Sequence, residues 1–304
     1  TTLKGRLEIL GNLMFEKLHY ELGFPYRRCG IIVAAFSEEE VAEVRRLYRQ
    51  GVENRVPRIE LCSAERMLEL EPKLAPDVAG GLYAPGGGVV EPYRYVFSLL
   101  ELAKRNGVEF LPNCKLENAS FANGAWTLQA HDGRRIRAKY AVNAAGLHAD
   151  DVSRIFGAEE FRISARKGEE YLLDRTSAAY PSKVVFPVPV KHSKGVLVIP
   201  TVDGTTMVGP TAEIVGDKED HSTTAENRSA VFRQARRMVP AVSERDLITG
   251  FSGSRPVMEG NDFYIAFSKK AENLIQAAGI QSPGLTASPA IAGYICGLLR
   301  ENGV

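Results

Sequence analysis

A run of small residues near the carboxyl end constrains the possible folds of this chain most strongly. Residues 277–290 read AAGIQSPGLTASPA; they follow an apolar strand pattern at residues 273–277 and lead into helix signals over residues 288–299. Glycines in the run remove side chains where a ligand or another backbone can come close. The first amides of a helix point outward and carry positive potential, so they suit an anionic or electron-rich group. An ordinary capped helix is the alternative interpretation, and the length of the run argues against it.

A second segment of this kind comes earlier in the chain. Residues 140–146 read YAVNAAG, a strand pattern that ends in Ala144, Ala145 and Gly146 and is followed by helix signals. A strand that ends in such small residues leaves room for a close approach. Taken alone, the segment fits an ordinary strand-to-helix turn at least as well.

The rest of the chain mixes helix and strand patterns. Apolar residues at helical spacing predict a helix over residues 3–22, and Ser37 with Glu40 forms a capping box that opens a second helix. The mixture predicts an α/β cofactor domain interleaved with an antiparallel-sheet domain. Further predictions are helices at residues 93–106 and 225–239, strands at 29–36 and 108–111, a β-hairpin of 126–130 with 135–138, and a glycine-rich connection at 80–90.

Size and charge exclude several classes of protein. The 304 residues are 44% hydrophobic, which allows a large core and about two domains. The 38 Lys+Arg balance the 37 Asp+Glu, so the chain lacks the basic surface that nucleic acid binding needs. No apolar run approaches the ~20 residues that cross a bilayer, and no secretory pattern opens the sequence. The 4 cysteines show no metal-ligand spacing, so we expect no metal site and reduced thiols.

Several segments, in the expected order along the chain, resemble the D-amino-acid-oxidase superfamily of FAD-dependent oxidoreductases. Residues 143–155 (NAAGLHADDVSRI) resemble the family segment near the adenosine part of FAD, and residues 279–292 (GIQSPGLTASPAIA) resemble its C-terminal flavin motif. Arg255 fits the place where the family keeps an arginine over the flavin. Similarity to the glycerol-3-phosphate dehydrogenase branch is carried by residues 166–171 (RKGEEY), 186–189 (FPVP), 201–204 (TVDG) and 208–212 (VGPTA).

The resemblance implies an α/β (α+β) fold in which an FAD-binding three-layer domain is interleaved with a mixed or antiparallel-sheet substrate domain. The family begins with a strand–GxGxxG–helix unit that holds the pyrophosphate of FAD, and the sequence contains no such fingerprint. We therefore expect a fragment with an incomplete FAD-binding domain, and the absence of FAD from this fragment is the alternative to FAD binding. The expected ranges are 1–29, 85–160 and 256–304 for the FAD-binding domain, and 30–84 and 161–255 for the substrate domain.

The resemblance also implies roles for particular residues. Arg255 is expected to bind the anionic end of a substrate, because a guanidinium fork matches phosphate or carboxylate oxygens; a surface arginine is the alternative. Lys167 and Glu170 are expected on a strand that passes the substrate face of the flavin, with a solvated strand face as the alternative. No residue stands out as the general base. The expected FAD contacts are Ala144, Ala145, Gly146, Gly279, Ile280, Gln281, Ser282, Pro283, Gly284, Leu285 and Thr286.

Together these features predict an FAD-dependent dehydrogenase that oxidises glycerol 3-phosphate or a similar small anionic hydroxy compound. Hydride would pass to flavin N5, and electrons would continue to a quinone or a partner subunit. One alternative is an oxidase of hydroxy acids or amino acids on the same fold, and another is a non-catalytic fragment without cofactor. We expect a cytoplasmic location, with peripheral contact to the inner membrane as a further option, and no nucleic acid partner.

Overall fold

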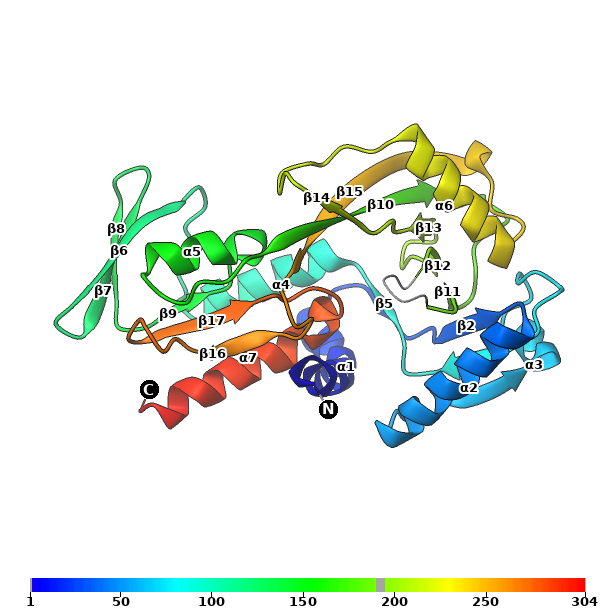
Figure 1. Ribbon diagram of the computed structural model, residues 1–304, viewed down its shortest axis with the longest axis horizontal. Coiled ribbons are helices and arrows are strands. Elements are labelled where there is room, and N and C mark those ends of the chain that lie inside the picture. Colours follow the sequence, from blue (N-terminus) through cyan, green and yellow to red (C-terminus); the bar gives the residue numbers. More distant parts are fainter. Residues whose placement is uncertain (1, 190–194, 304) are drawn as a thin grey trace.

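The computed structural model describes residues 2–189 and 195–303, which contain seven α-helices and seventeen β-strands (Figure 1). His192, which the sequence predicts at the surface or in a turn, lies outside these residues. The helices are α1 (Leu3–Leu22), α2 (Glu38–Glu53), α3 (Ala64–Leu70), α4 (Pro92–Arg105), α5 (Ala149–Ile155), α6 (Ala225–Met238) and α7 (Gly284–Glu301). The strands are β1 (Tyr26–Arg27), β2 (Ile31–Ala35), β3 (Glu60–Ser63), β4 (Gly80–Ala84), β5 (Val89–Val90), β6 (Leu116–Ala122), β7 (Ala125–Ala130), β8 (Arg135–Ala138), β9 (Ala141–Asn143), β10 (Ser164–Leu173), β11 (Val184–Pro187), β12 (Leu197–Pro200), β13 (Thr206–Gly209), β14 (Glu213–Val215), β15 (Leu247–Val257), β16 (Tyr264–Phe267) and β17 (Leu274–Ala278).

The largest sheet has nine strands and occupies one end of the molecule (Figure 1). Its order is β14-β10-β13-β12-β11-β2-β4-β3, and β15 runs antiparallel along the whole of β10. Only the β11–β2 pair is parallel among its described pairings. Helix α6 covers one face, where Phe232 packs with Tyr171 and Leu173 of β10. The side chains on the opposite face of β10 are therefore not part of this hydrophobic core.

A smaller sheet has the order β16-β17-β9, in which β17 and β9 are parallel. Helix α5 lies on one side of it, and α1 and α7 lie together on the other (Figure 1). Leu7 of α1 packs with Ile291 of α7 and Ile265 of β16, which fixes the two helices under the sheet. A third sheet, β6-β7-β8, projects beyond β9. Among the helices of the described ranges, none has the length and hydrophobicity of a membrane span.

Local signals in the sequence explain where the helices begin and end. The α1 helix has the predicted bounds and ends at Gly23, which adopts a left-handed conformation with φ 71°. The Ser37 side chain accepts a hydrogen bond from the Glu40 amide and caps α2, as predicted. The predicted hairpin of β7 and β8 is also confirmed.

Three local predictions differ from the structure. The predicted connection at residues 80–90 contains β4, an interior strand that pairs with β2 and β3. Glycine occupies position 81 of this strand because a side chain there would collide with Met67 and with the Val33 carbonyl oxygen. The predicted strand at residues 108–111 is not formed. The sheet that contains the β7–β8 hairpin has β6 as its third strand. Helix α7 starts at Gly284, four residues before the predicted start at Ser288, because the small residues of the run form its first turn.

The two predicted domains correspond in part to separate sheets. Strands β2–β4 and β10–β15, nearly all within residues 30–84 and 161–255, build the nine-stranded sheet. Strands β9, β16 and β17, from the other ranges, build the smaller sheet with α1 and α7. The division into an FAD-binding and a substrate domain with these boundaries stays a prediction.

Candidate functional site

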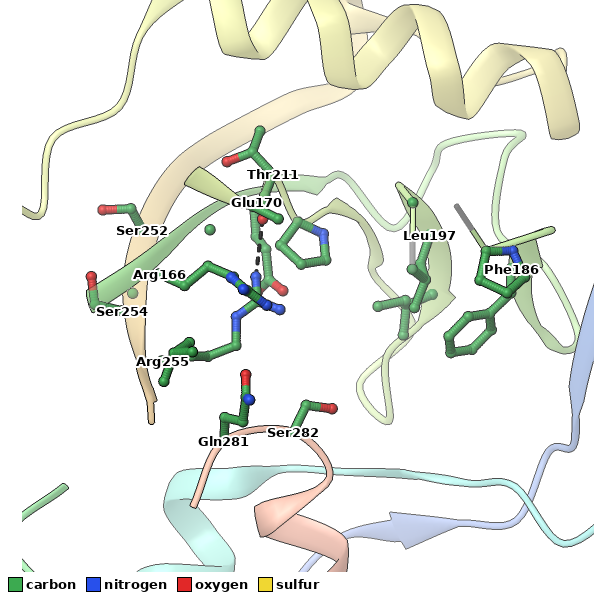
Figure 2. Close-up of a pocket in the computed structure, with 18 of the residues that line it drawn as sticks. Arg166, Glu170, Phe186, Leu197, Thr211, Ser252, Ser254, Arg255, Gln281 and Ser282 are labelled. Carbon is green, nitrogen blue, oxygen red and sulfur yellow. Dashed lines mark hydrogen bonds between the residues drawn. The ribbon is translucent and has the colours of Figure 1, made fainter. Parts of the chain in front are cut away.

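A cavity of about 1170 Å³ lies between the nine-stranded sheet and the turn before α7. Strands β10 and β15 form one wall, and Gln281 and Ser282 face them from the turn (Figure 2). Side chains alternate along a strand, so Arg166, Gly168 and Glu170 of β10 share the face that lines the cavity. The wall therefore carries charged groups of both signs.

Two arginines lie side by side on this wall. Arg166 of β10 and Arg255 of β15 are direct partners in the antiparallel register, and both point into the cavity (Figure 2). Burial lowers the pKa of Arg255; the Glu170 carboxylate opposes this shift, and the positive charge of Arg166 lowers the pKa further. Within the described residues, no carboxylate forms an ion pair with either guanidinium. The pair is thus a concentration of positive charge suited to a phosphate or carboxylate.

The backbone around Gly168 determines where the Arg255 side chain lies. Nη2 of Arg255 donates a hydrogen bond to the carbonyl oxygen of Thr211 at 3.0 Å. A Cβ at residue 168 would lie 2.8 Å from that nitrogen and 2.9 Å from both Pro210 Cβ and the Thr211 oxygen. Glycine therefore gives the guanidinium the space to lie over β10.

Glu170 lies where this cavity meets a second one of about 570 Å³. Leu285 and Thr286 of α7 line the second cavity together with the β12–β13 turn. Burial raises the pKa of the Glu170 carboxyl group, and the charge of Arg255 opposes that shift. Its side chain accepts no hydrogen bond from the described residues. The carboxylate is therefore available to a ligand.

The structure places Lys167 on the opposite face of β10. Its Nζ donates to Oδ2 of Asp220 at 2.7 Å and to Oγ of Ser222 at 3.1 Å, and only 4% of the residue is exposed. The hydrogen bond to Asp220 raises the pKa of Lys167. Lys167 thus holds the segment after β14 against the sheet and does not share the cavity with Glu170 and Arg255, because adjacent residues on a strand point to opposite faces.

The predicted FAD contacts gather at one edge of the smaller sheet. Ala144, Ala145 and Gly146 follow β9, and residues 279–286 follow its parallel neighbour β17. The carboxyl ends of parallel strands are where open α/β sheets bind ligands. Asn143, at the end of β9, is buried and donates to Gln276 of β17 at 2.8 Å, which ties the two strand ends together.

The residues at this edge fit a flavin. Pro283 precedes α7, and no side chain in the described chain caps the helix. The Gly284 amide donates to the Gln281 carbonyl oxygen, whereas the Leu285 and Thr286 amides have no acceptor among the described residues and remain free to donate. Gly146 has φ 57°, and no described atom lies within 4 Å of a Cβ built there. Gln281 and Ser282 reach the larger cavity, and Leu285 and Thr286 reach the second. This set offers backbone donors and open space to a planar, electron-rich ring.

The sequence interpretation missed several residues of the site. Arg166 could have been found by strand periodicity, since it is two and four residues from Gly168 and Glu170. Gly11 sits inside α1, where an added Cβ would collide with the Thr286 carbonyl oxygen, so it sets the close approach of α1 to α7. An isolated glycine within a helical pattern is a signal for such packing. Thr211 lies in the VGPTA segment that carries the family resemblance, but the sequence does not indicate its contact with Arg255.

Comparisons with known proteins identify related oxidoreductases. The family model described as DAO, FAD dependent oxidoreductase, matches residues 3–298. A glycerol 3-phosphate dehydrogenase of Caloramator mitchellensis is 39% identical over 304 residues, which span 99% of this chain and 62% of the relative. A glycerol 3-phosphate oxidase of Mycoplasma pneumoniae is 30% identical over 297 residues, spanning 95% of this chain and 77% of the relative.

A solved structure has the same fold. The dithionite-reduced L-alpha-glycerophosphate oxidase from Mycoplasma pneumoniae, with FAD bound, superimposes with a TM-score of 0.93 at 29% sequence identity. The match covers 99% of this chain and 80% of that chain. The chain thus spans between about three fifths and four fifths of the length of these three proteins.

Proposed function

This chain belongs to the DAO family of FAD-dependent oxidoreductases, and on that premise we propose that it oxidises the secondary alcohol of glycerol 3-phosphate or of a similar small anionic hydroxy compound. Two relatives that cover most of the chain are named for glycerol 3-phosphate, one as a dehydrogenase and one as an oxidase. We propose the dehydrogenase activity, with a quinone or a partner subunit as electron acceptor. A cytoplasmic location, with or without contact to the inner membrane, belongs to the same proposal.

The observation that carries the proposal is the in-register pair of Arg166 and Arg255. Two guanidiniums without a carboxylate partner among the described residues match the charge of a phosphate better than that of a single carboxylate. A ligand anchored there lies against the wall that contains Glu170 and opposite the turn of Gln281 and Ser282. This arrangement would hold the carbon that loses hydrogen between the sheet and the start of α7.

The residues that would hold the flavin are the turn before α7, the first turn of α7 and the segment after β9. When bound, FAD supplies the two-electron acceptor for the hydride. The chain itself binds and orients the anion through Arg166 and Arg255 and provides amides of α7 near an electron-rich ring edge. No GxGxxG sequence is available among the 304 residues to cradle the pyrophosphate.

A hydroxy-acid oxidase is the second candidate, because a single carboxylate also satisfies an arginine fork. Glycerol 3-phosphate and a 2-hydroxy acid, supplied separately as substrates, distinguish the two, and oxygen consumption distinguishes an oxidase from a dehydrogenase. A chain that cannot take up FAD would favour the third reading, a non-catalytic fragment.

The experiment that tests the proposal starts with an absorption spectrum before and after incubation with excess FAD and desalting. A visible flavin band that survives desalting supports cofactor binding by this chain, and turnover of glycerol 3-phosphate with an artificial acceptor is then expected. Arg166→Gln and Arg255→Gln should each raise KM for glycerol 3-phosphate at least tenfold, since each removes a charge-assisted contact of about 1.5–3 kcal/mol. An unchanged KM in both variants would remove the arginine pair from the substrate site.

A further inference from the structure

Among the described residues that line the larger cavity, Glu170 is the one with a carboxylate. Glu170 lies on the same face of β10 as Arg166, and its charge and that of Arg255 influence each other's pKa. Even so, the two side chains form no ion pair within the described structure, and no described residue donates a hydrogen bond to the carboxylate. Because Glu170 lines both cavities, its carboxylate is free to accept a hydrogen bond from a ligand that enters them.

The spacing between these groups fits one small ligand. The Arg255 guanidinium lies over Gly168, as the short distance from Nη2 to a Cβ at that position shows. Gly168 and Glu170 are consecutive residues on one face of the strand, which separates them by about 7 Å. A ligand with an anionic group at one end and a hydroxyl two or three atoms away would reach both.

We propose that Glu170 binds the reacting hydroxyl of the substrate and accepts its proton during oxidation. This inference rests on the proposed function. In the reaction the O–H bond breaks, and its proton passes to a carboxylate oxygen of Glu170. The hydrogen on carbon leaves with its electron pair to oxidised flavin, and the carbon–oxygen bond becomes a carbonyl. One proton and one hydride are thus removed, and the alcohol is oxidised by two electrons.

The other charged groups that line the two cavities, among the residues the structure describes, are less suited to this role. Arg166, Arg255 and Lys4 are cations on the walls of the larger cavity, and Nζ of Lys4 donates to the carbonyl oxygen of Asn261. Glu91 and Asp203 line only the second cavity. Hydrogen bonds from Thr201 and Thr205 lower the pKa of Asp203 to about 2, which makes it a poor proton acceptor. Burial acts on Glu170 in the opposite direction and makes its carboxylate more basic.

A binding experiment on the flavin-free chain tests the hydroxyl contact without turnover. Glycerol 3-phosphate is compared by calorimetry with propane-1,3-diol monophosphate, which lacks the secondary hydroxyl, and with inorganic phosphate. The wild type should prefer glycerol 3-phosphate over the deoxy compound by about tenfold, the effect of one charge-assisted hydrogen bond. Glu170→Ala should abolish this preference while inorganic phosphate still binds. Glu213→Gln, which removes an exposed carboxylate from β14, is the matched control and should behave as the wild type.

A pH–rate profile of the FAD-loaded enzyme tests the proton transfer. In the wild type, kcat/KM should fall as the pH drops below the pKa of Glu170, because a protonated carboxyl group cannot accept a proton. Glu170→Gln should lose about 10²–10⁴-fold in kcat/KM and lose this acidic limb, while Glu170→Asp should recover the limb at a reduced rate. Equal thermal unfolding of the variants would confirm that they are folded.

The outcomes separate the two proposals. If the wild type turns over glycerol 3-phosphate but Glu170→Ala keeps the tenfold preference, or Glu170→Gln keeps the acidic limb, Glu170 is not the acceptor and the proposed function stands. If the wild type binds neither phosphate compound, the arginine site fails, and the role of Glu170 is overturned with it.

Discussion

A single methyl group at Gly168 should disturb anion binding through Arg255. A Cβ there would lie 2.8 Å from Nη2 of Arg255 and 2.9 Å from both Pro210 Cβ and the Thr211 oxygen. A proline ring and a carbonyl group yield little, so the flexible guanidinium must move. We therefore expect Gly168→Ala to displace Arg255 without removing its charge.

The size of the effect follows from the contact that is lost. Displacement breaks the 3.0 Å hydrogen bond to Thr211 and withdraws one of the two guanidiniums from the anion. A hydrogen bond to a charged group contributes about 1.5–3 kcal/mol, and each 1.4 kcal/mol corresponds to about tenfold in affinity. Phosphate binding should therefore weaken about 10- to 100-fold, and KM for glycerol 3-phosphate should rise in parallel.

Gly253→Ala is the matched control, because Gly253 is the direct partner of Gly168 in the β10–β15 register. A Cβ built at residue 253 has no described atom within 4 Å. Calorimetric titration with inorganic phosphate should give a wild-type affinity for this variant. Equal affinities for the two alanine variants would refute the argument that space above Gly168 positions Arg255.

Three further predictions concern stability. Gly11→Ala should lower the Tm by several degrees in calorimetry, because overpacking typically costs about 1–3 kcal/mol. The control is Gly293→Ala, on an open face of α7, which should not lower the Tm. Equal Tm values for the two variants would disprove close α1–α7 packing. The hydrogen bond from the Thr201 hydroxyl lowers the pKa of Asp203 to about 2. The contribution of the Asp203 carboxylate to folding stability is therefore complete above the unfolded pKa of 3.8 and disappears as the pH falls through about 2. Asp203→Asn should lower the Tm at pH 6 but not at pH 2. Hydrogen bonds to Glu219 and, to a smaller extent, to Asp151 raise the pKa of His148 above 6.5. The contribution of His148 to folding stability is therefore complete below pH 6.5 and is lost as the pH rises through the folded-state pKa. His148→Gln should flatten this part of a plot of Tm against pH.

Local signals in the sequence predicted the elements that are stabilised mainly by contacts between residues close in the sequence. The α1 helix, the Ser37 cap of α2 and the hairpin of β7 and β8 depend on neighbours a few residues away. Strand β4 could not be predicted in this way, because Gly81 is required by Met67 and Val33, which approach from other elements. The sequence shows the glycines but not the atoms that exclude a side chain there.

The same difference between local and long-range contacts decides which parts of the candidate site could be predicted. The family motifs located Arg255, Glu170 and the turn before α7, all of which line the cavities. They also grouped Lys167 with Glu170, although strand alternation turns Lys167 toward Asp220. Strand periodicity alone places Arg166 on the face of Glu170, but its position beside Arg255 is shown only by the register of β10 and β15, which pairs distant segments.

Anaerobic reduction of the FAD-loaded chain by glycerol 3-phosphate tests the central claim most directly. The account predicts that the visible flavin band bleaches on addition of glycerol 3-phosphate, and that Arg255→Gln requires at least tenfold more substrate for the same rate. A chain that retains FAD but is bleached only by amino acids would contradict it, and bleaching only by hydroxy acids without phosphate would exclude glycerol 3-phosphate as the substrate.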